Sequence, residues 1–99
     1  MEIQQGAVLK VEKIKDPVFV ASKNFFNQSG EIIGCPILGE STENPLHIYV
    51  EMDENKGYIQ CEQMKMLDLR VRGYKIIDRV KMADVINVTD AIQSIFDYI

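Results

Sequence analysis

Few residues of this 99-residue sequence have the type and spacing that enzymatic chemistry requires. The one histidine, His47, lies where apolar and polar residues alternate, which indicates a half-exposed strand position and not a general base. The sequence contains no G-x-S-x-G nucleophile motif, no H-E-x-x-H metal-binding pair and no G-x-x-x-x-G-K-S/T phosphate loop. Motifs therefore assign no catalytic residue, and the catalytic residues stay unknown at this level.

The cysteines and the acidic residues do not form a metal-binding pattern either. A zinc site needs close pairs such as C-x-x-C, and neither Cys35 nor Cys61 has a Cys or His that near. We expect two buried, unpaired thiols. The acidic residues between 40 and 54 lack the alternating spacing of a calcium-binding loop, so we expect a solvated acidic edge. The sequence thus predicts neither a metal nor another cofactor.

Basic residues concentrate in residues 62–81, although the formal net charge of the chain is −4. This segment holds six basic and three acidic side chains, whereas the rest of the chain holds five basic and twelve acidic ones. An acidic chain is not typical of a general nucleic-acid binder, but a basic segment can bind phosphates or an acidic peptide. The alternative is a solvated surface of strands and loops.

These residues must be positioned by a series of short elements. Apolar alternation and β-branched residues predict strands, separated by clusters of Gly, Pro, Asn, Asp and Ser. Residues 23–30 predict a turn or a single helical turn, and residues 39–45 predict a surface loop. Residues 53–57 predict a hairpin connection, while residues 64–69 fit no single pattern. The predicted strands are residues 6–13, 17–21, 31–38, 46–51, 58–62 and 74–80.

The last segment of the chain predicts an amphipathic helix. Apolar residues recur there at spacings of three and four, and polar residues occupy the other side. The pattern covers about two heptads, fewer than is typical of a coiled coil, so we expect the helix to pack on the sheet. The predicted apolar face consists of Val85, Val88, Thr89, Ile92, Ile95, Phe96 and Ile99.

Composition and length fit a single domain over residues 1–99. Apolar residues make up 46% and charged residues 26%, as in a globular protein with a core. No uncharged apolar run reaches the roughly 18 residues of a membrane span. The N-terminus lacks the basic and apolar regions of a secretory signal. We expect a cytoplasmic protein that does not enter a membrane.

The order of these segments resembles that of the MazF/PemK family of toxin–antitoxin toxins. The resemblance covers residues 6–99 and includes the C-terminal helix. It rests on Gly6-Ala7-Val8, Pro17-Val18-Phe19-Val20-Ala21-Ser22, the Asn-rich turn 24–30, Ile32-Ile33-Gly34-Cys35-Pro36-Ile37, Gly57-Tyr58-Ile59-Gln60-Cys61-Glu62-Gln63, Leu67-Asp68 and Arg72.

The resemblance implies a mainly β fold with α: a small SH3-like β-barrel plus a C-terminal amphipathic helix, of the MazF/PemK/CcdB-like type. It also implies a homodimer that cleaves single-stranded RNA without a metal. An antitoxin-like peptide or protein is the partner that the resemblance implies.

Two positions depart from the family pattern where its chemistry is expected. Active members have an Arg before the proline of the second strand, where this sequence has Asp16. A Thr or Ser normally follows the Pro-Ile of the third strand, where this sequence has Leu38. The loop between the first two strands is also short, with only residues 12–16. Cleavage through the 2′-hydroxyl places negative charge on the phosphate, which a cation stabilises and a carboxylate does not.

A nearby lysine and a loop hydroxyl could replace the missing groups. Three functions therefore remain open. The protein is an RNA-cleaving toxin with a rearranged site, an RNA- or peptide-binding module that does not cleave, or a CcdB-like poison of a protein such as DNA gyrase. The candidate residues for binding RNA or a partner are Lys13, Lys15, Ser41, Thr42, Gln63, Arg70 and Arg72.

Overall fold

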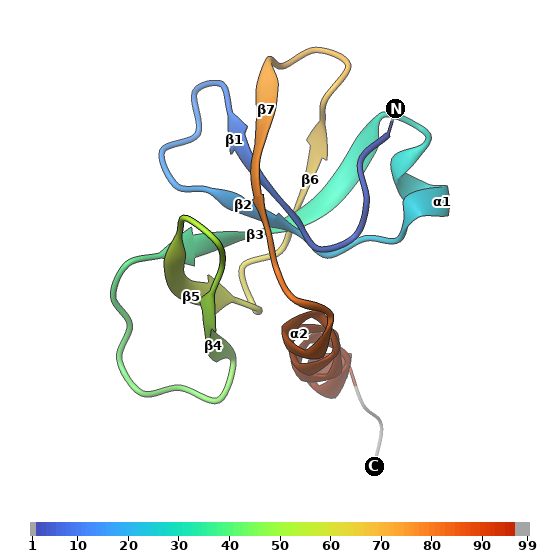
Figure 1. Cartoon of the computed structure of the whole chain (residues 1–99). Helices are drawn as coiled ribbons and strands as arrows, with labels where there is room; N and C mark the ends of the chain where they lie inside the picture. Colours follow the sequence, from blue (N-terminus) through green and yellow to red (C-terminus); the bar gives the residue numbers. More distant parts are fainter. Residues whose placement is uncertain (1, 97–99) are drawn as a thin grey trace.

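Strands dominate the computed structural model, which describes residues 2–96 (Figure 1). Within this range seven strands form one curled antiparallel sheet, and the longer of two helices packs beside it. Neither of these helices has the length and apolar character to span a membrane. The elements are β1 (Ala7–Val11), β2 (Val18–Val20), α1 (Asn24–Asn27), β3 (Glu31–Leu38), β4 (His47–Glu51), β5 (Lys56–Gln60), β6 (Lys65–Asp68), β7 (Tyr74–Arg79) and α2 (Met82–Phe96).

The strand order places the first and the last strand side by side. Along the sheet the order is β4-β5-β3-β2-β1-β7, and β6 pairs with β3 beside this row. β1 pairs with β7 from Ala7 opposite Arg79 to Val11 opposite Tyr74. All these strand pairings are antiparallel. β1 is therefore held on one edge by β2 and on the other by a strand from the far end of the chain.

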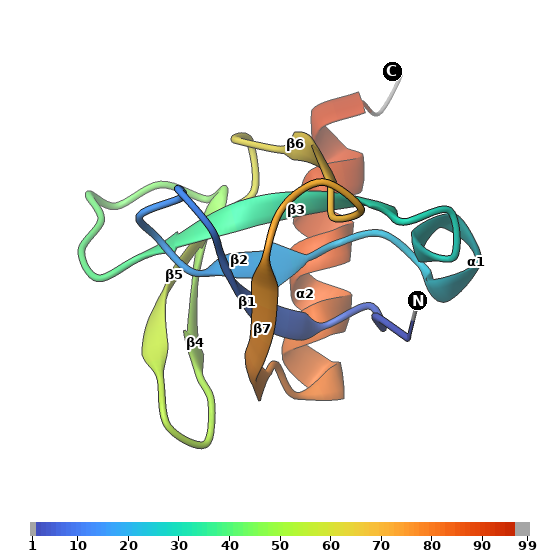
Figure 2. The same ribbon diagram turned by 90° about the horizontal axis from the view of Figure 1, so that it is seen from above.

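Both faces of the central strands are buried, which explains the apolar runs in β1 and β2. Side chains alternate across a strand, so neighbours along the chain enter different cores. Val8 and Phe19 join the core that includes Val88 of α2. Leu9 and Val18 join a second core on the other face. Figure 2 shows α2 running along one side of the sheet, where it covers the first of these cores.

A buried asparagine joins α1 to the N-terminal segment. The Nδ2 of the fully buried Asn27 donates to the backbone oxygens of Ile3 (2.9 Å) and Ser22 (3.0 Å). Its Oδ1 accepts a hydrogen bond from the Ser22 hydroxyl, which itself accepts from the backbone N–H of Ile33 (2.9 Å). The Asn27 amide is thus fully paired, as its burial requires.

The structure confirms the predicted mainly β fold with a C-terminal helix. The residues without a clear pattern, 64–69, contain β6, and the polar residues 23–30 contain α1. β5 begins at Lys56, earlier than predicted. The reason is a tighter turn than expected, in which the Met52 N–H donates to the Asn55 oxygen (2.8 Å).

The predicted apolar face of α2 is buried only in its first half. Val85 and Val88 lie in the core. Ile95 and Phe96 are 39% and 70% exposed, so the prediction that they pack on the sheet is wrong. The end of α2 extends beyond the strands in Figure 2, so the periodicity continues where there is no sheet to cover it. Ile99, which was assigned to the same face, lies outside the described residues.

Candidate functional site

The candidate site lies where one edge of β3 changes its partner. Glu31–Gly34 pair with β6 and Ile37–Leu38 pair with β5, so residues 35 and 36 face none of the described strands on this edge. The Ile37 N–H donates to the Pro17 oxygen (2.9 Å) on the β2 side. Backbone groups of successive residues in a strand point to opposite edges, so the nitrogen of Pro36 faces the gap. Proline has no N–H to leave unpaired, which makes it acceptable inside this strand.

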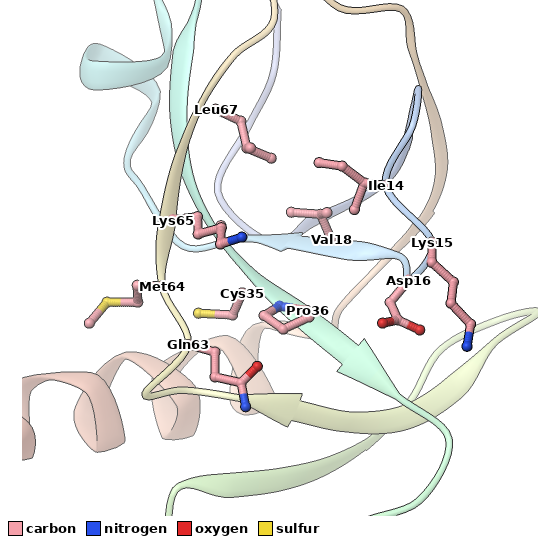
Figure 3. Close-up of a pocket in the computed structure, with 11 residues that line it drawn as sticks. Ile14, Lys15, Asp16, Val18, Cys35, Pro36, Gln63, Met64, Lys65 and Leu67 are labelled. Carbon is pink, nitrogen blue, oxygen red and sulfur yellow. The ribbon is translucent and has the colours of Figure 1, made fainter.

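A cleft of about 460 Å³ opens at this gap. Figure 3 shows that its side chains come from the β1–β2 loop, from β2, β3 and β6, and from the chain between β5 and β6. The apolar lining includes Ile14, Val18, Cys35, Pro36, Met64 and Leu67. The side chains with polar or charged ends are Lys15, Asp16, Gln63 and Lys65.

The short β1–β2 loop brings Lys15 and Asp16 to the cleft. Lys13 reverses the chain with a positive φ of 65°. The Nζ of Lys10 then donates to the backbone oxygens of Ile14 (3.3 Å) and Lys15 (2.9 Å). These bonds hold the loop against β1, so the shortened loop is an ordered part of the cleft wall.

The charged groups favour an anionic ligand. Lys65 reaches the cleft from β6, while Lys15 and Asp16 reach it from the β1–β2 loop (Figure 3). Two ammonium groups and one carboxylate leave a formal charge of +1. A unit charge about 4 Å from a phosphate oxygen contributes about 1 kcal/mol in water and about 4 kcal/mol at an effective dielectric of 20. By formal charge alone, the lining attracts an anion such as a phosphate.

The cleft contains only part of the predicted binding set. Lys15 and Gln63 line it. Lys13 lies in the same loop but is exposed and outside the lining. Arg70 and Arg72 lie in the turn between β6 and β7 and do not line it. These arginines are therefore not brought together with the lysines in one site.

Arg70 is engaged by a neighbouring carboxylate. Its Nε and Nη2 donate to Asp68 Oδ1 (2.9 Å) and Oδ2 (3.0 Å). The hydrogen bond from Arg70 is the main cause that lowers the pKa of Asp68. Because the pair is exposed to solvent, it contributes little to stability, and its guanidinium charge is already balanced.

The predicted hydroxyls of Ser41 and Thr42 lie in the β3–β4 loop, outside the cleft lining. Ser41 Oγ forms hydrogen bonds with His47 Nδ1 (2.5 Å) and with the Thr42 oxygen (2.8 Å). The other ring nitrogen, His47 Nε2, pairs with Glu62 Oε2 (2.9 Å). His47 lies at a partly buried position of β4, with its side chain 13% exposed, and both ring nitrogens have partners. The hydrogen bond from His47 is the main cause that lowers the pKa of Glu62.

Lys65 is a charged residue of the cleft that the family resemblance and the sequence motifs do not identify. It lies in the stretch to which no element was assigned. The signal was the alternation of Leu67 and Leu69 with Asp68 and Arg70, which is typical of a strand. Side chains two apart share a face of a strand, so Lys65 reaches the cleft together with Leu67.

The cysteines offer no nucleophile to this cleft. Cys35 and Cys61 are free and buried, as predicted. Burial is the main cause that raises the pKa of Cys35 to about 12 and that of Cys61 to about 11, so both thiols stay protonated at neutral pH. Among residues 2–96, no group of three or more His, Cys, Asp and Glu side chains is placed to hold a metal ion.

Residues 7–96 match the family model described as the PemK-like, MazF-like toxin of type II toxin–antitoxin systems. No curated protein matches the sequence. The structure resembles the MazE–MazF complex (form I) from Deinococcus radiodurans, with a TM-score of 0.86, 16% identity and 95% of each chain covered. It also resembles an endoribonuclease in complex with its cognate antitoxin from a mycobacterial species. That match has a TM-score of 0.82 and 14% identity and covers 95% of this chain and 94% of the other. At these identities the likeness concerns the fold.

Proposed function

The chain belongs to the PemK-like, MazF-like toxins of type II toxin–antitoxin systems, and from this premise we propose that its cleft binds and cleaves single-stranded RNA. The observation that carries the proposal is the presence of Lys15 and Lys65 in one cleft. Ammonium groups along a groove bind the phosphates of a single strand without regard to sequence. The Gln63 amide adds donors and an acceptor that suit the edge of a base.

In this mechanism the RNA supplies its own nucleophile. The 2′-oxygen attacks the adjacent phosphorus, a 2′,3′-cyclic phosphate forms, and the bond to the 5′-oxygen breaks. Asp16 accepts the 2′-hydroxyl proton, and water returns a proton to the 5′-oxygen. Lys15 and Lys65 stabilise the negative charge that builds on the phosphate oxygens. None of these steps requires a metal.

Asp16 also favours a second candidate function, an RNA-binding module that does not cleave. Its carboxylate stands where the family pattern has an Arg, and it lines the cleft. A carboxylate near a phosphate opposes the charge that builds in the transition state, by about 1–4 kcal/mol at about 4 Å. The two lysines then hold the strand without accelerating its cleavage.

The variant Asp16→Asn separates these two candidates. If Asp16 is the base, the substitution lowers the cleavage rate by about 10²- to 10⁴-fold, while RNA binding becomes tighter because a repulsion is gone. If the protein only binds, neither the wild type nor the variant cleaves, and binding still becomes tighter. The measurement is incubation with an end-labelled single-stranded RNA of mixed sequence, followed by gel separation and mapping of the new ends. Binding that does not tighten in Asp16→Asn contradicts both candidates.

Salt dependence tests whether the cleft is the binding site. Each phosphate contact on a single strand contributes about 0.7 to the slope of log affinity against log salt concentration. We expect Lys65→Ala to reduce this slope by about 0.7. Lys81→Ala is the matched control, because Lys81 is exposed and does not line the cleft. Equal effects of the two variants would place the RNA elsewhere.

We also infer an antitoxin partner, a homodimer and a cytoplasmic location for this chain. The MazE–MazF complexes of similar fold support the antitoxin, and the family membership supports the rest. Light scattering of the purified chain tests the dimer, and co-expression with a neighbouring short acidic protein tests the antitoxin. Induced expression distinguishes the remaining alternative, since growth arrest with intact RNA and broken DNA would point to a CcdB-like target.

A further inference from the structure

Ser41, His47 and Glu62 form a hydrogen-bonded row that the RNA cleft does not use. The imidazole lies between the hydroxyl and the carboxylate, with Nδ1 2.5 Å from Ser41 Oγ and Nε2 2.9 Å from Glu62 Oε2. None of the three residues lines the cleft. A nucleophile within hydrogen-bond reach of a base, with the base oriented by a third group, is the arrangement that activates serine in hydrolases.

The carboxylate determines which ring nitrogen can act as the base. Ionised Glu62 is only an acceptor, so His47 Nε2 must carry a proton to pair with it. The neutral ring then has its lone pair on Nδ1, which faces Ser41 Oγ. The ring nitrogens have exchanged the roles they hold in the serine proteases, but the chemistry of the row is the same.

The row is held by the backbone on both sides of His47. The His47 N–H donates to the Asn44 oxygen (3.0 Å), and the Leu46 N–H donates to Asn44 Oδ1 (2.8 Å). The Cys61 N–H donates to the Leu46 oxygen (2.9 Å), which fixes the neighbouring Glu62 beside β4. Ser41 is half-buried and therefore remains accessible to a small molecule.

The charges around this row exclude RNA as its substrate. Glu40 and Glu43 flank Ser41 in the same loop, and both are exposed. Together with Glu62 they repel a phosphodiester backbone, whereas the cleft with its two lysines attracts one. The surroundings instead suit a neutral or cationic molecule.

We propose that Ser41 is the nucleophile of a second site that hydrolyses neutral or cationic carboxylic esters, with His47 as its base and Glu62 as a positioning residue. Ser41 Oγ attacks the ester carbonyl while His47 Nδ1 takes the hydroxyl proton. The bond to the alcohol oxygen breaks, and His47 returns that proton to the leaving alcohol. Water then attacks the acyl-serine, again with His47 taking and returning a proton, which releases the acid and restores Ser41. Each cycle consumes one ester and one water.

The Thr42 carbonyl competes for the same proton. The Ser41 hydroxyl has one hydrogen, which it donates either to His47 or to the Thr42 oxygen. Only the first arrangement is reactive.

The full chain is tested with two probes, p-nitrophenyl acetate and a fluorophosphonate that reacts with activated serines. We expect a stoichiometric burst of nitrophenol and a fluorophosphonate adduct on Ser41, located by mass spectrometry. Ser41→Ala abolishes both, and His47→Gln lowers the rate by about 10²- to 10⁴-fold. Ser94→Ala is the matched control, because the Ser94 hydroxyl is bonded to the Ala91 oxygen (2.6 Å) and has no imidazole partner.

Glu62→Gln tests the positioning role. The amide keeps an acceptor for Nε2–H but no longer stabilises the positive charge that the ring gains while it holds the serine proton. The kcat therefore falls while KM stays unchanged, a split that a merely structural role would not produce. Circular dichroism verifies that each variant is folded. An adduct on Ser41 no faster than on Ser94 in the wild type, or one that persists unchanged in folded His47→Gln, would overturn the proposal.

Discussion

The buried amide of Asn27 provides a quantitative test of what holds the N-terminal segment in place. Asn27→Ala removes two donated hydrogen bonds and one accepted bond, leaving the Ile3 and Ser22 oxygens without their donor. A buried polar group without a partner costs about 1–3 kcal/mol. The hydrogen bond to the Ile3 oxygen is buried, and the hydrogen bond to the Ser22 oxygen is partly buried. We therefore expect the free energy of unfolding to fall by about 3 kcal/mol.

The assay is urea unfolding at 25 °C followed by circular dichroism, with thermal melts alongside. A loss of about 3 kcal/mol lowers the melting temperature by roughly 12–24 °C in a domain of this size. Asn24→Ala is the control, because Asn24 is exposed and its Oδ1 accepts one bond from the Gln5 N–H (3.0 Å). We expect the control to cost less than about 1 kcal/mol.

Asn27→Asp tests the chemistry of the same position. A carboxylate keeps the bond from the Ser22 hydroxyl but faces the Ile3 oxygen without a donor, so folding raises the pKa of the new carboxyl above its unfolded value of about 3.9. The protonated form is then the one that the fold favours. The loss of stability is smallest at low pH and grows as the pH rises through the folded-state pKa. A cost below about 1 kcal/mol for Asn27→Ala, or wild-type stability of Asn27→Asp at pH 7, would refute this reasoning.

Two further predictions concern titratable groups. Burial acts to raise the pKa of Asp78, but hydrogen bonds from Asn55 and from three backbone N–H groups lower it overall. The stability that this carboxylate contributes is present above its unfolded pKa and is lost as the pH falls through its folded pKa. In urea unfolding measured at several pH values, Asp78→Asn should therefore lose less stability than the wild type as the pH is lowered. An unchanged loss of stability at low pH contradicts this prediction. Burial raises the pKa of Cys35 to about 12 and that of Cys61 to about 11, so neither thiol is ionised at pH 8. A disulfide reagent at pH 8 should therefore label neither thiol in the native chain and both thiols in urea. Rapid labelling of the native chain would contradict this prediction.

Local patterns predicted most elements of this fold, although β6 was not assigned and β5 begins earlier than predicted. The apolar run of β1 and the spacing of Val85 and Val88 correctly predict which residues are buried. Burial follows the side-chain period of a strand or of a helix, and the sequence pattern reports that period. The same rule failed at Phe96. Periodicity reports the face of a helix, but it does not report where the sheet beneath that helix ends.

The cleft depends on contacts that no local pattern encodes. Asp16 and Lys65 are far apart in the sequence and share a cleft only because β2 and β6 both pair with β3. The gap between β5 and β6 could have been suspected from Pro36, since a proline inside a strand indicates an unpaired edge. The hydrogen-bonded row of Ser41, His47 and Glu62 likewise depends on how the β3–β4 loop closes onto His47. The alternating sequence around His47 indicated only a strand.

The pairing of β1 with β7 has a consequence for how this protein is made. A ribosome delivers Ala7–Val11 long before Tyr74–Arg79, so during synthesis β1 has one edge without its partner. An unpaired edge is prone to wrong pairing, and contacts between distant segments form slowly. A nascent chain that stops before β7 lacks the strand that completes this part of the sheet. This part of the sheet is therefore complete only after Tyr74–Arg79 have left the ribosome.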